Sequence, residues 1–417
     1  MLIQFLVENY GSIKKQCILS MEPSTDSEHP ENLNTDGDYT ALNCAAVYGA
    51  NASGKSCLFR AITCGIHMVR SSNARQVNDR LPMIPFLFDE QSIQQPTHLE
   101  YTFIASDQRK YIYGFSASQT GITEEYLYCY FSAKKSMIFE RKGETYRYSR
   151  RFQAELQPNE KMNTPNKLFL ATATAWNAVS TLSAFKWFAE GIDTFTNDDN
   201  MISHVLERYR TDPETYVGFT REMLRQADIN ISDIRIESRK KNSSGKIIDG
   251  LIVNGQLIQP EETVELIIQT GHTVKTADHQ ERNYLLPLDA ESLGTKQLFY
   301  LAPLFKDALE NGKTLVVDEI DRSMHPFIVK YLLNLFRNAG INQKNAQLIL
   351  TTHATTLLSL STFRRDQIWF TEKDAETGIT DLYSLDEYPV KKTENIEKGY
   401  LAGRYGAIPY LQTEEIV

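Results

Sequence analysis

The sequence predicts an α/β protein in which one mostly parallel sheet carries a large insertion. The last third of the 417-residue chain alternates helices with short apolar strands, which is typical of parallel strands joined by right-handed crossovers. A glycine-rich loop follows an apolar strand near the N-terminus. Between these two parts, residues 97–149 alternate aromatic and polar side chains, which indicates an antiparallel sheet with one solvated face.

Residues 1–70 predict the N-terminal lobe of the parallel sheet. Apolar runs predict strands over 2–8 and 16–21, a polar loop covers 22–38, and a buried strand follows over 41–48. Gly49 to Ser56 then leads into an apolar-periodic helix that ends near Arg70. We therefore expect a strand, a glycine-rich loop and a helix in direct succession.

Residues 71–165 predict the antiparallel β-subdomain. Its aromatic residues recur at every second position in three stretches, 97–103, 110–115 and 125–130. Two interpretations fit this stripe. It is either a base-stacking platform for nucleic acid or ordinary cross-strand packing, and we favour packing.

Residues 166–230 predict a helical insertion, with helices over 166–190, 199–210 and 214–227. Residues 231–290 return to short strands in a β-hairpin region. The basic cluster Arg239-Lys240-Lys241 precedes Asn-Ser-Ser-Gly, and we interpret it as a solvated hairpin tip rather than a phosphate contact.

Residues 291–417 predict the C-terminal lobe of the same sheet. Helices over 292–311, 325–338 and 354–360 alternate with strands over 314–319, 347–352 and 367–371. A last strand near 379–385 is expected to pair back as a hairpin.

Composition limits the class of protein. The chain has 53 acidic residues against 44 Lys+Arg, a net charge of −9, and 41% hydrophobic residues, enough for a real core. The acidic balance disfavours a surface that coats nucleic acid. Five cysteines without CxxC pairs favour reduced thiols in a cytoplasmic protein. Without a basic leader or an apolar run of ~18–20 residues, we expect neither secretion nor a membrane partner.

The glycine-rich loop carries the strongest chemical signal. Gly49-Ala-Asn-Ala-Ser-Gly-Lys-Ser56 matches GxxxxGK[ST] between a strand and a helix, the context that this phosphate-binding motif requires. Lys55 is expected to neutralise the β- and γ-phosphates, and the Ser56 hydroxyl to bind Mg²⁺. The residues expected to contact ATP are Asn51, Ala52, Ser53, Gly54, Lys55, Ser56 and Cys57.

Two acidic residues end the apolar strand over 314–319. Asp318 suits the Mg²⁺ shell, and Glu319 suits polarisation of the attacking water. Because side chains alternate along a strand, we expect these two carboxylates to face in different directions.

His353 follows the next strand along the chain. Ligands of open α/β sheets bind at the carboxyl ends of strands, so Lys55, Asp318, Glu319 and His353 are expected to converge there. His353 would then contact the γ-phosphate as a second catalytic residue beside Glu319.

The segment Ser292-Leu-Gly294-Thr295 opens the helix over 292–311. A serine and a glycine at a helix N-terminus form either a plain N-cap or a second anion-binding site. The residue types alone fit both interpretations.

These motifs together resemble an ABC-type ATPase of the SMC/RecF/OLD side. More closely, the chain resembles the prokaryotic RloA/AbiL-like ATPases linked to phage defence. The segments that fit are FLVENYGSIKK, YGANASGKS, EEYLYCY, NKLFLATA, DEIDRSMHP, TTHATTLL, RRDQIWFTEKD and YLAGRYGAIPYL. The match is spread over nearly the whole chain.

The resemblance implies a P-loop ABC-type ATPase head with an antiparallel β-subdomain and an inserted helical subdomain. It identifies the glycine-rich loop as Walker A, the acidic strand end as Walker B, His353 as the switch histidine, and Ser292 to Thr295 as a degenerate signature. It further implies a homodimer or larger homo-oligomer, in which Ser292, Gly294 and Thr295 of one subunit close over ATP and Mg²⁺ bound by another.

The chain departs from the family pattern in four ways. His325 stands where a D-loop aspartate is usual, and the signature is not LSGGQ. No heptad run predicts a coiled-coil arm like that of SMC proteins. The residues after Leu385 are too few for an appended nuclease domain like that of OLD proteins.

Two biological hypotheses follow. The first is a defence ATPase that controls a separately encoded effector, such as a nuclease, after a nucleic acid or phage component triggers it. The second is a DNA-repair or chromosome-maintenance ATPase that clamps DNA, with Arg364-Arg365 and Lys391-Lys392 as candidate contacts. A metabolic kinase or GTPase fits poorly, since no NKxD motif follows a strand. The tail over 399–411 either docks a partner or packs on the core.

Overall fold

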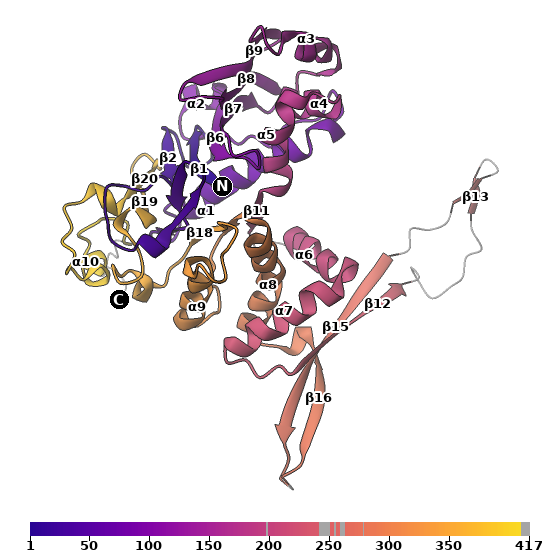
Figure 1. Cartoon of the computed structure of the whole chain (residues 1–417), viewed down its shortest axis with the longest axis vertical. Coiled ribbons are helices and arrows are strands. Elements are labelled where there is room, and N and C mark those ends of the chain that lie inside the picture. Colours follow the sequence, from indigo (N-terminus) through magenta and orange to yellow (C-terminus); the bar gives the residue numbers. More distant parts are fainter. Residues whose placement is uncertain (197–198, 242–250, 254–255, 259–262, 278, 410–417) are drawn as a thin grey trace. The chain divides into compact units, whose positions relative to one another are not determined.

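The computed structural model describes residues 1–196, 199–241, 251–253, 256–258, 263–277 and 279–409. These residues form two compact units. The first unit comprises Met1–Thr196, Asp307–Asp321 and Val329–Val417, and the second comprises Asn197–Lys306 and Arg322–Ile328. Figure 1 shows the elements of both.

A seven-stranded antiparallel sheet forms one layer of the first unit, in the order β10-β9-β8-β7-β6-β1-β2. Helices α4 and α5 pack against one face of this sheet (Figure 1), where Trp187 of α5 stacks on Phe103 with ring centroids 4.1 Å apart. The strands are β1 (Leu2–Glu8), β2 (Cys17–Ser20), β6 (Thr97–Ile104), β7 (Lys110–Ser118), β8 (Gly121–Tyr130), β9 (Lys135–Lys142) and β10 (Thr145–Tyr148).

A six-stranded sheet forms the second layer, in the order β11-β17-β18-β5-β19-β20, and all its pairs are parallel except β19–β20. Its strands are β11 (Ile192–Phe195), β17 (Thr314–Val317), β18 (Gln347–Thr351), β5 (Cys44–Tyr48), β19 (Ile368–Lys373) and β20 (Thr380–Ser384). One continuous apolar cluster joins both sheets to helix α1 (Lys55–Arg70). The alternation in the last third of the sequence therefore does form one sheet.

The helices and smaller strands of the first unit fill the space around the two sheets. They are α2 (Glu90–Gln94), α3 (Gln153–Leu156), α4 (Phe169–Ala175), α5 (Val179–Glu190) and α10 (Ile396–Leu401), with the hairpin β3 (Leu33–Asp36) and β4 (Tyr39–Leu42). Helix α9 (Pro326–Arg337) begins in the second unit and continues into the first.

The second unit combines helices with an antiparallel ribbon. Tyr209 of α6 stacks on Phe299 of α8 with centroids 4.6 Å apart, which fixes the helical part. Strands β12, β15 and β16 pair in that order, and β13 pairs with β14. The elements are α6 (Asp199–Thr211), α7 (Pro213–Gln226), β12 (Asp233–Lys241), β13 (Leu251–Val253), β14 (Gln256–Ile258), β15 (Thr263–Lys275), β16 (Glu281–Pro287) and α8 (Leu293–Asn311), whose last turns lie in the first unit.

Several local expectations were wrong. The single helix predicted over 166–190 is two helices, α4 and α5. The single strand predicted over 41–48 is two strands separated at Asn43, whose amide donates to the carbonyls of Glu31 and Phe336. Strand β3 lies in the predicted polar loop. Strand β11 follows α5 in the predicted helical insertion, because parallel pairing with β17 outweighs local preference there. The helix predicted over 354–360 is one 3₁₀ turn, η5 (Thr355–Leu357).

The aromatic stripe is packed. Tyr101, Phe103, Tyr113 and Phe115 are fully buried under α5, and the tyrosines of the other face donate hydrogen bonds to Glu100 and Glu140 across the sheet. These contacts support packing over base stacking. Residues Arg239–Lys241 end β12, and residues 242–250 lie outside the described residues, so the hairpin tip stays a prediction. Among the described helices, none has the length and apolar character to cross a membrane.

Candidate functional site

The glycine-rich loop lies between β5 and α1, as its motif predicts. Gly54 precedes the first helical residue with φ at +112°, a conformation that L-residues rarely adopt, and a Cβ atom there would collide with the Thr380 side chain. Glycine is therefore required at this position. The loop turns its backbone toward the N-terminus of α1, the arrangement that binds phosphate groups in other proteins.

Lys55 is held inside this loop. The residue is only 5% exposed, and its Nζ donates hydrogen bonds to the carbonyls of Gly49 at 2.8 Å and Ala50 at 2.9 Å. Burial lowers the pKa of Lys55, and the nearby carboxylates of Asp318, Glu319 and Asp321 oppose that shift. The ammonium group and the acidic strand end therefore lie close together.

Thr351 ties the two acidic residues of that strand end to β18. Its hydroxyl donates to Asp318 Oδ1 at 2.6 Å and accepts from the backbone N–H of Glu319, also at 2.6 Å. Thr351 is fully buried and Asp318 is 9% exposed. These bonds hold the Asp318 carboxylate and the Glu319 backbone in place.

The strand alternation from which we expected Asp318 and Glu319 to face different ways does not apply to them. Strand β17 ends at Val317, so strand alternation does not reach the two acids. Instead Glu319 adopts a left-handed backbone conformation with φ at +53°. Such strain in a residue other than glycine is concentrated at functional sites, where surrounding contacts maintain it.

The predicted catalytic and phosphate-binding residues meet in one cavity of about 200 Å³. Both Glu319 and His353 line it, together with the loop and with Ser12 of the β1–β2 turn. The backbone N–H of His353 donates to Asp321 Oδ2 at 2.9 Å, which anchors the loop after β18. The loop residues that line the cavity are Asn51, Ala52, Ser53, Gly54, Lys55, Ser56 and Cys57.

Not every loop side chain points into this cavity. Ser53 Oγ shares a hydrogen bond with Thr371 Oγ1 at 2.7 Å, and Cys57 Sγ lies 3.3 Å from both the Tyr10 carbonyl and the Ser12 N–H. These two residues therefore present backbone rather than side-chain groups to a ligand. Asn51 and Ala52 are exposed at the rim.

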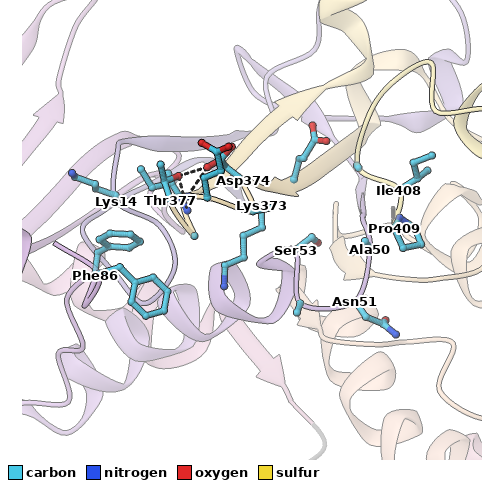
Figure 2. A pocket seen from close by; sticks show the side chains of 18 of the residues that line it. Lys14, Ala50, Asn51, Ser53, Phe86, Lys373, Asp374, Thr377, Ile408 and Pro409 are labelled. Atoms are coloured by element: carbon cyan, nitrogen blue, oxygen red, sulfur yellow. Dashed lines mark hydrogen bonds between the residues drawn. The ribbon is translucent and has the colours of Figure 1, made fainter. Parts of the chain in front are cut away.

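A larger cavity of about 810 Å³ adjoins the same loop and shares Asn51, Ala52 and Ser53 with the first. Figure 2 shows its side chains, with Phe86 and Lys14 on one wall and Lys373 on the β19–β20 hairpin. Aromatic rings and cationic groups beside a phosphate loop can hold the nucleoside part of a nucleotide.

The residues present fit ATP and Mg²⁺. A glycine cradle, a helix N-terminus and a buried ammonium group suit a triphosphate. Mg²⁺ needs few protein ligands because substrate phosphates and water complete its shell. Ser56 lines the cavity, whereas Asp318 is not among its lining residues and would act on Mg²⁺ through a water of that shell. In the described part of the chain, no group of three or more His, Cys, Asp or Glu side chains forms a metal site by itself.

The signature-like segment lies in the second unit. Ser292 Oγ accepts the backbone N–H of Thr295 at 3.1 Å and pairs with its hydroxyl at 2.8 Å, so Ser292 is the N-cap of α8. A Cβ atom on Gly294 would lie 2.5 Å from the Ser323 carbonyl, so only glycine fits. Leu293 between them is 67% exposed. His325 caps α9, since its Nδ1 accepts the Phe327 N–H at 3.2 Å.

Sequence reasoning missed Thr351 and Asp321. Threonine is common near strand ends, so Thr351 gave no separate signal beside His353. Asp321 stands three residues after Asp318, and its contact with His353 depends on how two loops meet.

A comparison with models of known protein families identifies the family of this chain. Residues 44–359 match the family model described as "AAA domain, putative AbiEii toxin, Type IV TA system". No curated protein sequence matches the chain.

Solved structures with low sequence identity are also similar to this chain. An Smc head bound to the C-winged helix domain of ScpA is 13% identical, with 92% of this chain and 97% of that chain covered and a TM-score of 0.48. The SMC head domain from Thermotoga maritima is 11% identical, with 92% and 98% covered and a TM-score of 0.40. RecF of the RecFOR pathway is 14% identical, with 92% and 98% covered and a TM-score of 0.36.

The family model spans more than half of the sequence and includes the phosphate loop, both acids and His353. The fold is an α/β P-loop fold with an antiparallel β-subdomain and an inserted helical part. The chain belongs to the family of AAA domains described as putative AbiEii toxins of type IV TA systems.

Proposed function

We propose that this chain binds and hydrolyses ATP to ADP and phosphate with Mg²⁺. One observation carries the proposal: Lys55 and Ser56 share a single cavity with Glu319 and His353. A nucleotide-binding loop alone would not need a carboxylate and an imidazole at the far end of its phosphate cavity.

In this proposal, each residue of the site has its own role in hydrolysis. Backbone N–H groups of residues 51–57 and the Lys55 ammonium bind the phosphates and orient the γ-phosphate toward Glu319. Glu319 accepts a proton from the attacking water, and His353 donates a hydrogen bond to the γ-phosphate. Ser56 and Asp318 would hold Mg²⁺, which neutralises charge on the β- and γ-phosphates when bound. The nucleoside occupies the larger cavity beside Phe86.

The second half of the site comes from another copy of the chain. Ser292, Gly294 and Thr295 stand at the N-terminus of α8, where backbone N–H groups and the helix dipole favour an anion. Leu293 between them is 67% exposed, so this turn is accessible to another copy of the chain. In this proposal ATP closes a homodimer, and hydrolysis reopens it.

For the biological role, we propose a sensor and regulator in prokaryotic antiviral defence, close to the RloA/AbiL-like ATPases, that controls a separately encoded effector. The family description names a toxin of type IV toxin–antitoxin systems, which supports this role. A nucleic acid or phage component is the proposed trigger. The five cysteines are free thiols, which supports a cytoplasmic location.

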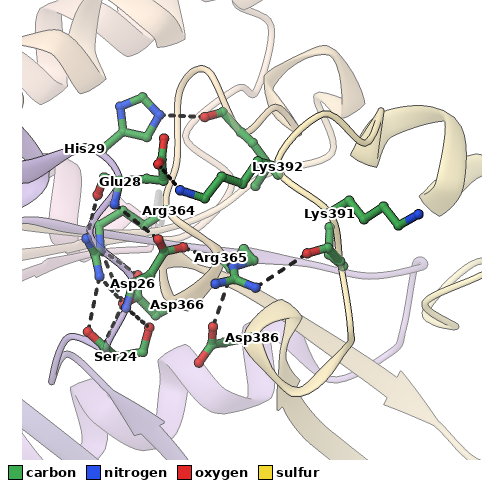
Figure 3. A network of polar contacts seen from close by, with 12 residues as sticks. Ser24, Asp26, Glu28, His29, Arg364, Arg365, Asp366, Asp386, Lys391 and Lys392 are labelled. Carbon is green, nitrogen blue, oxygen red and sulfur yellow. Dashed lines mark hydrogen bonds and ion pairs between the residues drawn. The ribbon is translucent and has the colours of Figure 1, made fainter.

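The contacts of the basic pairs disfavour direct DNA clamping. Figure 3 shows Arg364, Arg365 and Lys392 turned toward acidic side chains. Arg364 is 1% exposed and pairs with Asp366 at 2.8 Å, while Arg365 pairs with Asp26 at 3.0 Å. These basic side chains form ion pairs within the protein and are therefore less available to DNA phosphates. The defence role is the better supported proposal.

Two substitutions test the ATPase assignment. Lys55→Ala should weaken ATP binding at least about tenfold, because it removes the buried charge that faces the phosphates. Arg60→Ala is the matched control, since Arg60 is exposed on the same helix. Titration of a fluorescent ATP analogue measures both affinities, and equal affinity for Lys55→Ala and the parent chain would refute the phosphate-loop assignment.

Glu319→Gln should slow hydrolysis at least about a hundredfold while ATP still binds, because the amide cannot accept the proton. The variant should accumulate as an ATP-bound dimer in size-exclusion chromatography with light scattering. Hydrolysis at the parental rate would show that Glu319 is not the base.

A further inference from the structure

The C-terminal helix α10 packs beside the loop that carries His353. Tyr400 of α10 is 6% exposed, stacks on Phe370 with centroids 5.5 Å apart and meets Tyr48 edge-on at 6.3 Å. Tyr48 is the last residue of β5 and directly precedes the phosphate loop. The tail therefore contacts the strand that leads into the candidate site.

The rest of the described tail is fixed to the same core. Tyr405 stacks on Phe370 at 6.0 Å, and its carbonyl accepts the Tyr383 hydroxyl at 2.8 Å. Glu394 accepts the Tyr405 hydroxyl at 2.9 Å. Tyr400, Tyr405 and Ala407 of the tail are buried, and residues 410–411 lie outside the described residues. Of the two interpretations of this segment, the structure supports packing.

Two hydrogen bonds hold the His353 loop to neighbouring segments. The His353 N–H donates to Asp321 Oδ2 at 2.9 Å. The Thr355 hydroxyl donates to Glu397 Oε1 of α10 at 3.0 Å. Since the loop contains only the single turn η5, its orientation depends on these outside contacts.

Buried polar atoms gather at the same junction. Tyr48 Oη and Asp321 Oδ1 are buried without a hydrogen-bond partner among the residues that the structure describes. Burial raises the pKa of Tyr48 well above its usual value, and the charges of Asp321 and Glu397 act in the same direction. Unpaired buried polar atoms are rare in native cores and require a specific explanation. Here they mark the meeting point of the phosphate-loop strand, the acidic loop and α10.

We propose that Glu397 is a positioning residue for ATP hydrolysis. Through Thr355 it orients the His353 loop, so that the imidazole faces the cavity that Lys55 and Glu319 also line. The tail is thereby part of the hydrolytic apparatus, although Glu397 does not line that cavity itself. This inference rests on the proposed ATPase function and on the role of His353 at the γ-phosphate.

The experiment compares steady-state ATP hydrolysis and ATP affinity in variants of the full chain. Glu397→Ala and Thr355→Val each remove one partner of the hydrogen bond, and the double variant removes both. Glu397→Gln keeps an acceptor oxygen at the same reach. Lys398→Ala is the matched control, since Lys398 is exposed on the same helix.

We expect kcat to fall about fivefold in Glu397→Ala and in Thr355→Val, which corresponds to ~1 kcal/mol for one hydrogen bond. The Kd for ATP should stay at its parental value, because neither residue lines the phosphate cavity. The Tm should fall by no more than a few degrees, as expected for the loss of one hydrogen bond. Glu397→Gln should recover most of the lost kcat. The double variant should be no slower than either single variant, because both remove the same bond.

Three results would overturn the inference. Parental kcat in Glu397→Ala would show that the bond does not position the loop. A parallel loss of kcat, ATP affinity and Tm would show that α10 only stabilises the fold. If the parent chain binds ATP no better than Lys55→Ala and hydrolyses none, the proposed function fails first, and the inference fails with it.

Discussion

Thr351 links the two acidic residues to the strand that leads to His353. A single hydroxyl contacts both the Asp318 carboxylate and the Glu319 backbone, so the relative position of the two acids depends on it. The left-handed Glu319 is held by this contact, since its N–H would otherwise lose its hydrogen-bond partner.

Thr351→Val should therefore reduce ATP hydrolysis about tenfold or more, because it removes a hydrogen bond to a charged group and leaves the Glu319 N–H unpaired. Thr314→Val is the control: Thr314 is equally buried and lies at the other end of β17, where it donates to Gln347. Both variants should lose similar stability, and only Thr351→Val should lose kcat. Equal kcat in the two variants would contradict the positioning role of Thr351.

At the scale of single residues, the sequence predicted which residues of the phosphate loop lie together better than it predicted contacts between distant segments. Lys55 and Ser56 could be assigned to the loop because the glycines, the strand and the helix of the motif are neighbours in sequence. The expectation that Asp318 and Glu319 face different ways rested on strand alternation, which fails because β17 ends before them. The Asp321–His353 contact joins residues 32 positions apart and has no local signal.

Helix α4 is fixed to the antiparallel sheet by a buried ion pair. Glu125 accepts the N–H groups of Phe169 at 2.6 Å and Leu170 at 2.8 Å, and Arg141 lies 3.6 Å from the same carboxylate. Both side chains are at most 2% exposed. Burial raises the pKa of Glu125, and the Arg141 charge opposes that shift. The pair therefore contributes mainly by satisfying the first turn of α4.

Glu125→Ala should lower the free energy of unfolding by about 3–5 kcal/mol, because it leaves the N–H groups of Phe169 and Leu170 without their acceptor and the buried Arg141 without a counter-charge. Glu124→Ala, which removes the neighbouring exposed ion pair with Lys142, should cost less than about 1 kcal/mol. Urea denaturation measures both. Equal costs for the two variants would show that the buried pair does not hold α4.

At the scale of elements, two long periodic segments were predicted well, whereas the long helix predicted over 166–190 is two helices, α4 and α5, and several short elements were missed. The helix over 292–311 and the strand over 2–8 carry enough apolar residues to show their period. Strand β11 has four residues, and its pairing with β17 is decided by the parallel sheet rather than by its own sequence. Tertiary contacts outweigh local preference in such short elements.

At the scale of the whole molecule, acidic residues outnumber basic ones and give a net charge of −9, so basic side chains readily find acidic partners within the chain. The basic residues once considered as DNA contacts form ion pairs with acidic residues of the same unit, and only the Lys391 side chain points away in Figure 3. These pairs fix loops of the first unit to one another.

A chain with Lys391→Ala and Lys392→Ala should therefore bind duplex DNA with the same affinity and salt dependence as the parent. If these lysines contact phosphates, the variant should bind more weakly, and the slope of log affinity against log salt should fall by about 2. Fluorescence anisotropy with a duplex at several salt concentrations distinguishes the two results. The second outcome would restore the DNA-clamping hypothesis.

The central claim is a composite ATPase site shared by two copies of the chain. Lys55→Ala removes the phosphate-binding ammonium group from the loop of a subunit and leaves the Ser292 segment of that subunit unchanged. Leu293→Glu leaves the loop intact and places a carboxylate beside the expected γ-phosphate. Because Leu293 is 67% exposed, this second change costs little packing.

The most direct measurement is ATP hydrolysis by an equimolar mixture of these two variants. Each should be inactive alone, whereas a mixed dimer contains one intact site, formed by Lys55 of one chain and Ser292 of the other. We therefore predict that mixing restores hydrolysis to about a quarter of the parental rate, since half of the dimers are mixed and each has one of two sites. A mixture no more active than the separate variants would contradict the composite site.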